Sequence, residues 1–167
     1  MRRKMIATGI TIMLVIVAIS IWITLPKQHD RTLQGTYYQL GNEEGIKEVT
    51  IHIDGEIRRN VFQGMTFEGI LDIEDEEIPV PKGERNVTIK FDDDNRGVIV
   101  YAGFRNGEPY TQSYGSIFAN DDFSKITILK GSWDSEKGYM ITAPAKDYSE
   151  AINISNELMK KFIKEPL

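Results

Sequence analysis

The sequence predicts a mainly β domain that follows one N-terminal transmembrane helix and ends in an amphipathic helix. Three observations lead to this prediction. An uncharged apolar run opens the chain, and short segments in which apolar and polar residues alternate follow it. The C-terminal residues then change to the 3.6-residue period of a helix. We therefore expect an antiparallel β-meander, barrel or sandwich of about 8–10 short strands.

Composition limits the classes of protein that this chain can represent. Its 167 residues fit one domain. It has no cysteine, and its two histidines lie far apart in the sequence, which disfavours a structural zinc site. The net charge of −5 disfavours a nucleic-acid partner, because phosphate binding needs clustered cations. We expect no cofactor and no bound metal.

The apolar run covers residues 5–25 and has the length of a membrane span. At 1.5 Å per residue it extends roughly 31 Å, close to the thickness of a bilayer's hydrocarbon core. Residues 1–4 include three cations and form a basic stub that the positive-inside rule keeps in the cytoplasm. We expect a single-pass signal-anchor in the cell membrane, with an extracytoplasmic C-terminal domain.

A cleavable signal peptide is the alternative. Its apolar region is normally about 7–15 residues long, shorter than this run. The small-x-small site near the end of the run is Ala18-Ile19-Ser20, and cleavage there leaves apolar residues at the new terminus. The uncleaved anchor is therefore favoured, and both alternatives export the domain. We interpret residues 26–32 as a linker and residues 33–167 as the extracytoplasmic domain.

The exported part is acidic. Residues 28–167 carry all 25 acidic residues and 16 of the 20 basic ones, a net charge of −9. Such a domain is repelled by anionic lipid and attracts basic partners or cations weakly. One acidic stretch contains Asp72, Glu74, Asp75, Glu76 and Glu77. A solvated loop is favoured there over a weak calcium site.

Alternating residues locate the strands. The clearest cases are 49–53 and 87–91, where apolar side chains occupy every second position. Further candidate strands are 35–40, 56–62, 66–73, 98–104, 109–114, 116–120, 125–129 and 138–143. The pairs Asp54-Gly55, Asp94-Asn95 and Asn106-Gly107 predict hairpin turns between them, the first with a three-residue or bulged loop.

The turn at Asn106-Gly107 sets a register. A two-residue loop pairs Gly103 with Tyr110, Tyr101 with Gln112, and Ile99 with Tyr114. The turn at Asp94-Asn95 likewise pairs Phe91 with Val98 and Ile89 with Val100. Both arrangements place apolar residues on one face of the sheet.

This register also gathers a candidate binding face. It consists of Tyr101, Tyr110, Gln112 and Tyr114, with Thr88 and Lys90 on the neighbouring strand. Tyrosines with an amide can stack on a ligand or partner and form hydrogen bonds with it. The alternative is that these residues form a second core layer under the C-terminal helix or the amphipathic outer wall of a sheet. The opposite face, Val98, Val100, Ala102 and Phe104, is predicted to be core.

The C-terminal residues 148–163 form the predicted helix. Asp147 is the predicted N-cap, and Glu150 completes a variant of the capping box. Apolar side chains occupy one half of the helix, interrupted only by Ser155. Packing against the sheet is favoured over docking on a membrane, because the polar face mixes both charges.

Two resemblances accompany this interpretation. The segment Leu33-Gln34-Gly35-Thr36-Tyr37-Tyr38 resembles the Gly-x-Trp start of lipocalin-type barrels, with Tyr37 in place of the tryptophan. The resemblance implies a lipocalin-like barrel. The overall layout resembles uncharacterised single-pass proteins of Gram-positive bacteria that carry a small cysteine-free β-domain outside the membrane. That second resemblance implies no function.

Two functions compete at this point. The first is a membrane-tethered binding or accessory module that interacts with a partner in the membrane or cell envelope. The alternative is a tethered hydrolase that acts on cell-envelope glycans through carboxyl groups. The module is favoured, because no motif in the chain combines an acid, a base and an orienting group, and we therefore assign no catalytic residue. A purely structural subunit is a variant of the first function.

Overall fold

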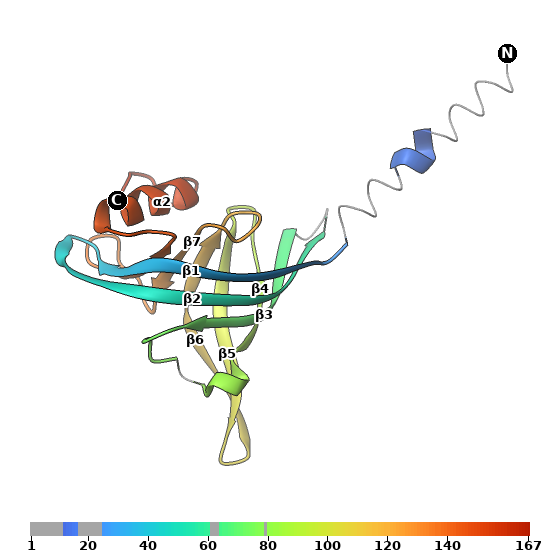
Figure 1. Cartoon of the computed structure of the whole chain (residues 1–167), viewed down its shortest axis with the longest axis horizontal. Coiled ribbons are helices and arrows are strands. Elements are labelled where there is room, and N and C mark those ends of the chain that lie inside the picture. Colours follow the sequence, from blue (N-terminus) through green and yellow to red (C-terminus); the bar gives the residue numbers. More distant parts are fainter. Residues whose placement is uncertain (1–11, 17–24, 61–63, 79) are drawn as a thin grey trace, which may run out of the picture.

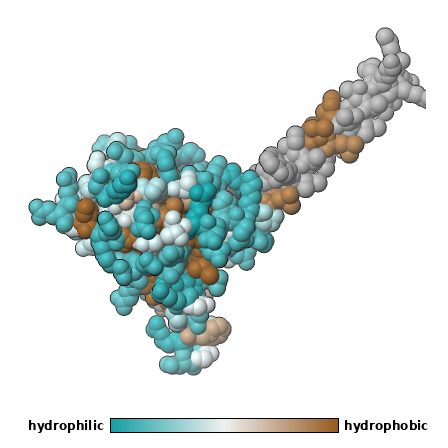
Figure 2. Space-filling model, viewed as in Figure 1, coloured by the Kyte–Doolittle hydropathy of each residue, from teal (hydrophilic) through white to brown (hydrophobic). Residues whose placement is uncertain are grey.

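The computed structural model describes residues 12–16, 25–60, 64–78 and 80–167. Most of the expected transmembrane segment, residues 5–25, lies outside these ranges. Within them, no helix has the length and apolar character needed to cross a membrane. Residues 12–16 are helical, apolar and exposed, whereas the face of the domain seen in Figure 2 is mostly hydrophilic. The membrane anchor therefore stays a prediction.

The domain is an antiparallel, nearly closed β-barrel of eight strands (Figure 1). The strands are β1 (Lys27–Gln39), β2 (Asn42–Asn60), β3 (Gly64–Ile73), β4 (Asn86–Lys90), β5 (Arg96–Arg105), β6 (Glu108–Ala119), β7 (Ile126–Lys130) and β8 (Tyr139–Ala143). Their order in the sheet is β4-β3-β2-β1-β8-β7-β6-β5. Because β1 pairs with β8, the sheet closes everywhere except between β4 and β5, which contact each other without a hydrogen-bonded ladder among the described residues.

Two predicted boundaries are wrong. The pair Asp54-Gly55 is not a turn, because β2 runs through it and pairs there with both β1 and β3. Gly55 lies opposite Gly69, and a Cβ atom on Gly55 would fall 2.7 Å from the Gly69 Cα atom. The glycine therefore permits a close approach of two strands within the sheet and marks no hairpin. Likewise, residues 27–32, taken above as a linker, form the first half of β1.

Candidate strands 109–114 and 116–120 are one strand, β6. A register shift near Val100 inserts one extra residue into β6, so that Ile99 lies opposite Gly115 and not opposite Tyr114. The other two predicted pairs, Gly103 with Tyr110 and Tyr101 with Gln112, are confirmed. The extra residue forms a β-bulge. Counting residue pairs outward from the hairpin turn does not predict such a bulge.

The faces of β5 are the reverse of those predicted. Val98, Val100 and Phe104 are 45, 40 and 69% exposed, whereas Ile99 and Tyr101 are fully buried inside the barrel. Both sets of side chains are apolar, so alternation alone could not choose between them. The face of β5 was assigned from an expected pairing with β4. That pairing does not exist, so the assignment was wrong.

The neighbouring residues show the same reversal. Thr88 and Lys90 point out of the barrel, away from Tyr101, and Ala102 is exposed on the outer face of β5. Gly97 lies on the inner face of β5, and a Cβ atom on it would clash with Ile89 of β4. Small residues on the inner face thus make room for side chains from β4.

Side chains fill the interior of the barrel. At one end Phe123 packs against Phe67 and Phe91, with ring centroids 5.0 and 5.5 Å apart. At the other end Ile78 and Val80, from the segment that links β3 to β4, belong to the same buried cluster. The core is therefore continuous from one end of the barrel to the other.

The C-terminal helix α2 (Tyr148–Met159) covers the outside of the barrel, as predicted. Asp147 caps it by accepting a hydrogen bond from the Glu150 backbone N–H at 2.8 Å. The helix ends at Met159 and not at residue 163. It packs on a second buried cluster formed by the outer faces of the strands, which includes Tyr38, Phe118, Leu129 and Met140.

Ser155, the interruption in the apolar face of α2, enters a buried cluster of hydroxyl groups. Its Oγ lies 2.8 Å from the Tyr38 hydroxyl, 2.8 Å from Thr142 Oγ1 and 3.1 Å from Thr127 Oγ1. Each of these groups has a partner, so the cluster satisfies the requirement that buried polar groups form hydrogen bonds. Together the four side chains join α2 to β1, β7 and β8.

The substitution Ser155→Ala tests this cluster. It leaves buried hydroxyls with fewer partners and should lower the free energy of unfolding by about 1–2 kcal/mol. Urea denaturation followed by tryptophan fluorescence measures the change. Ser149→Ala, on the exposed side of the same helix, should change it by less than about 0.5 kcal/mol. Equal effects of the two substitutions would contradict the role of the cluster.

A second pair of substitutions tests the faces of β5. Ile99→Ala removes a fully buried side chain and should cost about 2–4 kcal/mol of unfolding free energy. Val100→Ala changes an exposed position and should cost less than about 1 kcal/mol. Denaturation of both variants under the same conditions compares them. A larger cost at Val100 would restore the face assignment made from the sequence.

Candidate functional site

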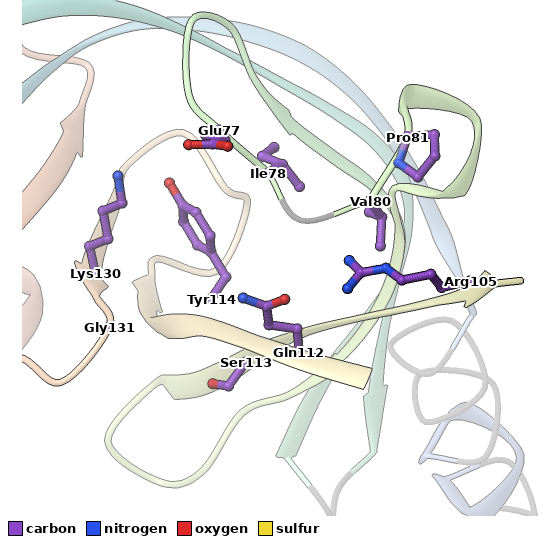
Figure 3. Close-up of a pocket in the computed structure, with 10 residues that line it drawn as sticks. All are labelled: Glu77, Ile78, Val80, Pro81, Arg105, Gln112, Ser113, Tyr114, Lys130 and Gly131. Carbon is purple, nitrogen blue, oxygen red and sulfur yellow. The ribbon is translucent and has the colours of Figure 1, made fainter. Parts of the chain in front are cut away.

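A groove of about 730 Å³ lies at the end of the barrel where β3 ends (Figure 3). One wall is part of the β3–β4 connection, described at residues 74–78 and 80–85, and contributes Glu77, Ile78, Val80 and Pro81. The facing wall is the β5–β6 arm, residues 100–113, together with the residues that follow it. This wall contributes Arg105, Gln112, Ser113 and Tyr114. Lys130 and Gly131, at the end of β7, close the groove at its inner end.

The β3–β4 connection keeps its position because it is anchored at several points. Ile78 and Val80 insert into the barrel core. Arg85 forms a largely buried ion pair with Asp72 of β3, and its Nε donates to the Val80 carbonyl oxygen at 3.5 Å. The apolar wall of the groove is thus the outer side of a segment that fills the barrel end.

Three side chains form a polar cluster at the inner end of the groove. The Tyr114 hydroxyl donates to Glu76 Oε2 at 3.1 Å, and Lys130 forms an ion pair with the same oxygen. The Glu76 side chain is only 8% exposed. The Lys130 Nζ atom also lies 5.1 Å from the centroid of the Tyr37 ring, within range of a cation–π contact. Glu76 therefore connects the β3–β4 connection to β6 and β7.

The two buried tyrosines of the site are neutral hydrogen-bond donors. Burial, followed by the negative charge of Glu76, raises the pKa of Tyr114 far above its ordinary value of 10.0. Burial also raises the pKa of Tyr101, whose hydroxyl donates to the Leu71 carbonyl oxygen at 2.8 Å. Neither phenol supplies a phenolate at neutral pH, so their chemistry is orientation and hydrogen bonding.

The structure divides the four predicted site residues. Gln112 and Tyr114 line the groove. Tyr110 is half-buried beside the groove residue Arg105, whose guanidinium lies 4.8 Å from the Tyr110 ring centroid. Tyr101 lies in the barrel core, where its ring meets that of Tyr114 edge to face at 6.0 Å. Tyr101 is thus a core residue of the barrel interior and does not belong to the layer beneath the C-terminal helix, and a binding role for the others stays a prediction.

Sequence reasoning missed the groove residues outside β6. Lys130 and Glu76 are 54 positions apart, and no local pattern connects them. Ile78 and Val80 carried a weak signal, because apolar residues directly follow an acidic stretch. Arg105 lies just after the candidate strand 98–104 and was not singled out, although it lines the groove and its guanidinium lies over the Tyr110 ring.

Several acidic residues considered for catalysis or calcium binding are paired with basic side chains. Asp72 pairs with Arg85, Glu76 pairs with Lys130, and Glu74 accepts from His52 Nε2 at 3.1 Å. The hydrogen bond from His52 lowers the pKa of Glu74. No cluster of three or more potential metal-binding side chains occurs in the part of the chain that the structure describes. This arrangement gives the hydrolase hypothesis no specific support.

Comparison of the chain with protein-family models, with curated proteins and with solved structures finds no match. The function is therefore argued from the groove and from the residues that form it.

The raised tyrosine pKa values predict a loss of stability in alkali. Tyr114 binds its proton more tightly in the folded than in the unfolded state, so its contribution is complete below pH 10 and decreases above it. Each such tyrosine should reduce the unfolding free energy by up to about 1.4 kcal/mol per pH unit in that range. Tyr114→Phe should make this slope shallower by the same amount. Denaturation at several pH values measures the slope, and an unchanged slope would contradict the assignment.

Proposed function

We propose that this protein is a membrane-tethered extracytoplasmic binding module that offers the groove to a partner in the cell envelope. The observation that carries the proposal is the position of the groove relative to the start of β1. β1 begins at Lys27, which pairs with Ile57, near the end of the barrel where β3 begins. The groove lies where β3 ends. An anchor that precedes β1 therefore leaves the groove pointing away from the membrane.

The composition of the groove supports binding. An apolar wall faces a wall of amide, hydroxyl and guanidinium groups, the combination typical of recognition sites. The cluster of Glu76, Tyr114 and Lys130 fixes the inner end without a free acid or base. Confinement at the membrane raises the effective concentration of the module for partners that are also held there.

Protease treatment tests the tether. Protease added to intact cells or protoplasts should remove the domain, because the signal-anchor places it outside the membrane. An epitope at the C-terminus, read by immunoblotting, follows the digestion, and a cytoplasmic protein serves as control. Protection of the domain until the cells are lysed would contradict the proposed orientation.

Site-specific photo-crosslinking tests the groove. A photoreactive amino acid at Gln112, an exposed groove residue, should give crosslinked products in intact cells. The same amino acid at Asn153, exposed on α2 away from the groove, is the matched control. Products that depend on position 112, and that Arg105→Ala reduces severalfold, support the proposal. Identical products at both positions, or none at Gln112, would remove the groove as the binding site.

A further inference from the structure

Among the residues that the structure describes, the first half of β6 has a neighbouring strand on one side only. β6 pairs with β5 from Glu108 onward, but its ladder with β7 covers only Gly115–Ala119. β7 ends at Lys130, and the chain then turns away after the Gly131 N–H donates to the Tyr114 carbonyl oxygen at 2.9 Å. The strand edge before Tyr114 is therefore open. Figure 1 shows the tip of the β5–β6 arm projecting beyond the barrel.

The turn of the arm determines which backbone groups this edge offers. Asn106 and Gly107 both have positive φ, 55° and 83°, as in the primed turns of two-residue hairpins. In such a hairpin Arg105 and Glu108 form the first hydrogen-bonded pair, and alternate residues point away from the partner strand. Thr111 and Ser113 therefore direct their N–H and C=O groups away from β5, toward the open edge.

A contact on β5, the other strand of the arm, agrees with this alternation of backbone direction. Phe104 lies opposite Pro109, in a pair that points outward on both strands. Its backbone N–H indeed leaves the hairpin and donates to Glu84 Oε2 at 3.4 Å. Pro109 has no N–H to offer, so the usable part of the β6 edge is short and centres on Thr111 and Ser113.

The groove adjoins this edge. Gln112, Ser113 and Tyr114 line it from β6, and Gly131 lines it where β7 would otherwise continue. An extended segment placed beside Thr111 and Ser113 takes the position of a prolonged β7, at the strand spacing of about 4.8 Å. Every second side chain of that segment then faces the β3–β4 connection across the groove, where Pro81 is exposed and Ile78 and Val80 are only 7 and 3% exposed, and the others face solvent.

Charge adds one more requirement. Arg105 forms no salt bridge with any residue for which the structure gives a position. Its guanidinium stacks on Tyr110 and extends into the groove (Figure 3). The other cation of the groove, Lys130, is paired with Glu76. A carboxylate on the occupant would therefore meet Arg105 near the tip of the arm.

We propose that the edge of β6 at Thr111 and Ser113 accepts an extended polypeptide segment of another protein as an added strand. Apolar side chains at alternate positions of the segment pack on the outer side of the β3–β4 connection, where Pro81 is exposed, and a carboxylate pairs with Arg105. The proposal rests on the function proposed above and names the class of partner. Main-chain hydrogen bonds supply affinity in this mode, and the apolar wall supplies specificity.

Peptide binding to the full-length protein in lipid nanodiscs tests the proposal. The probe is a short fluorescent peptide in which valine and threonine alternate, with glutamate at one end, and the readout is fluorescence anisotropy. N-methylation of one alternate set of its backbone nitrogens should weaken binding at least about tenfold, and methylation of the other set should not. Replacing the glutamate with glutamine should weaken binding severalfold.

Protein variants form the second arm of the experiment. Thr111→Pro removes an outward N–H without touching the ladder with β5, and it should weaken binding at least about tenfold. Ala102→Pro is the matched control, because Ala102 lies opposite Thr111 and points away from it on the other edge of the arm. Arg105→Gln should weaken binding of the glutamate peptide and not that of the glutamine peptide. The methylated peptides keep the test valid if a proline variant fails to fold.

Several results would overturn the proposal. The first is that no peptide binds. The second is that methylation of either set of backbone nitrogens lowers the affinity equally. The third is that a folded Thr111→Pro variant binds the peptide as tightly as the unchanged protein. Self-association of the protein that Thr111→Pro abolishes, without peptide binding, would assign the edge to a second copy of the chain. If the peptides fail while crosslinking at Gln112 persists in cells, the groove binds something other than a strand. If the peptides do not bind and crosslinking at Gln112 also gives no product, the proposed function is contradicted as well.

Discussion

The pairing of β1 with β8 is the constraint on which the rest of the structure depends. It joins β1–β4 to β5–β8, two groups of strands that share no other strand ladder among the described residues. The ladder is short, from Thr36 to Gln39 on β1. Gly35 permits it, because a Cβ atom there would fall 2.7 Å from the Thr142 carbonyl oxygen. The buried hydroxyl cluster reinforces the same junction, because Tyr38 and Thr142 belong to the two strands and Ser155 adds α2.

The seam between β4 and β5 is closed without strand pairing, and the groove results from this arrangement. β4 and β5 do not pair, and the barrel end beside them is filled by the β3–β4 connection. Ion pairs position this connection, Asp72 with Arg85 and Glu76 with Lys130. Such largely buried pairs contribute little net stability, because desolvation offsets their attraction. Their effect is on position, since both partners of each pair lose hydrogen bonds if the connection moves.

Periodicity and turn chemistry predicted much of the fold. The β class, the hairpin at Asn106-Gly107, the cap at Asp147 and the packing of the C-terminal helix follow from local patterns, and the structure confirms them. The predicted turn at Asp54-Gly55 and the predicted faces of β5 were wrong, each because the local pattern is ambiguous. A glycine that permits close strand contact resembles a turn glycine, and an apolar strand with two apolar faces has no signal of direction.

The candidate site was only partly predictable for a similar reason. Gln112 and Tyr114 lie on the strand that the tyrosine pattern indicated, but the groove also needs Ile78, Val80 and Lys130 from distant parts of the chain. Only the closure of the barrel brings these segments together. Local sequence therefore identifies one wall of the groove, and long-range contacts supply the other.

The filled interior finally determines where recognition can occur. Many eight-stranded barrels leave room for a small ligand inside, whereas here aromatic rings occupy one end and Ile78 with Val80 occupy the other. Opening that end would expose apolar core and separate Glu76 from Lys130 and Tyr114. Binding on the outer side of the β3–β4 connection would leave the apolar core covered and the contacts of Glu76 intact. The groove gains its apolar wall and its fixed polar end from interactions that the fold already needs, so the proposed binding at the rim would require no rearrangement of the core.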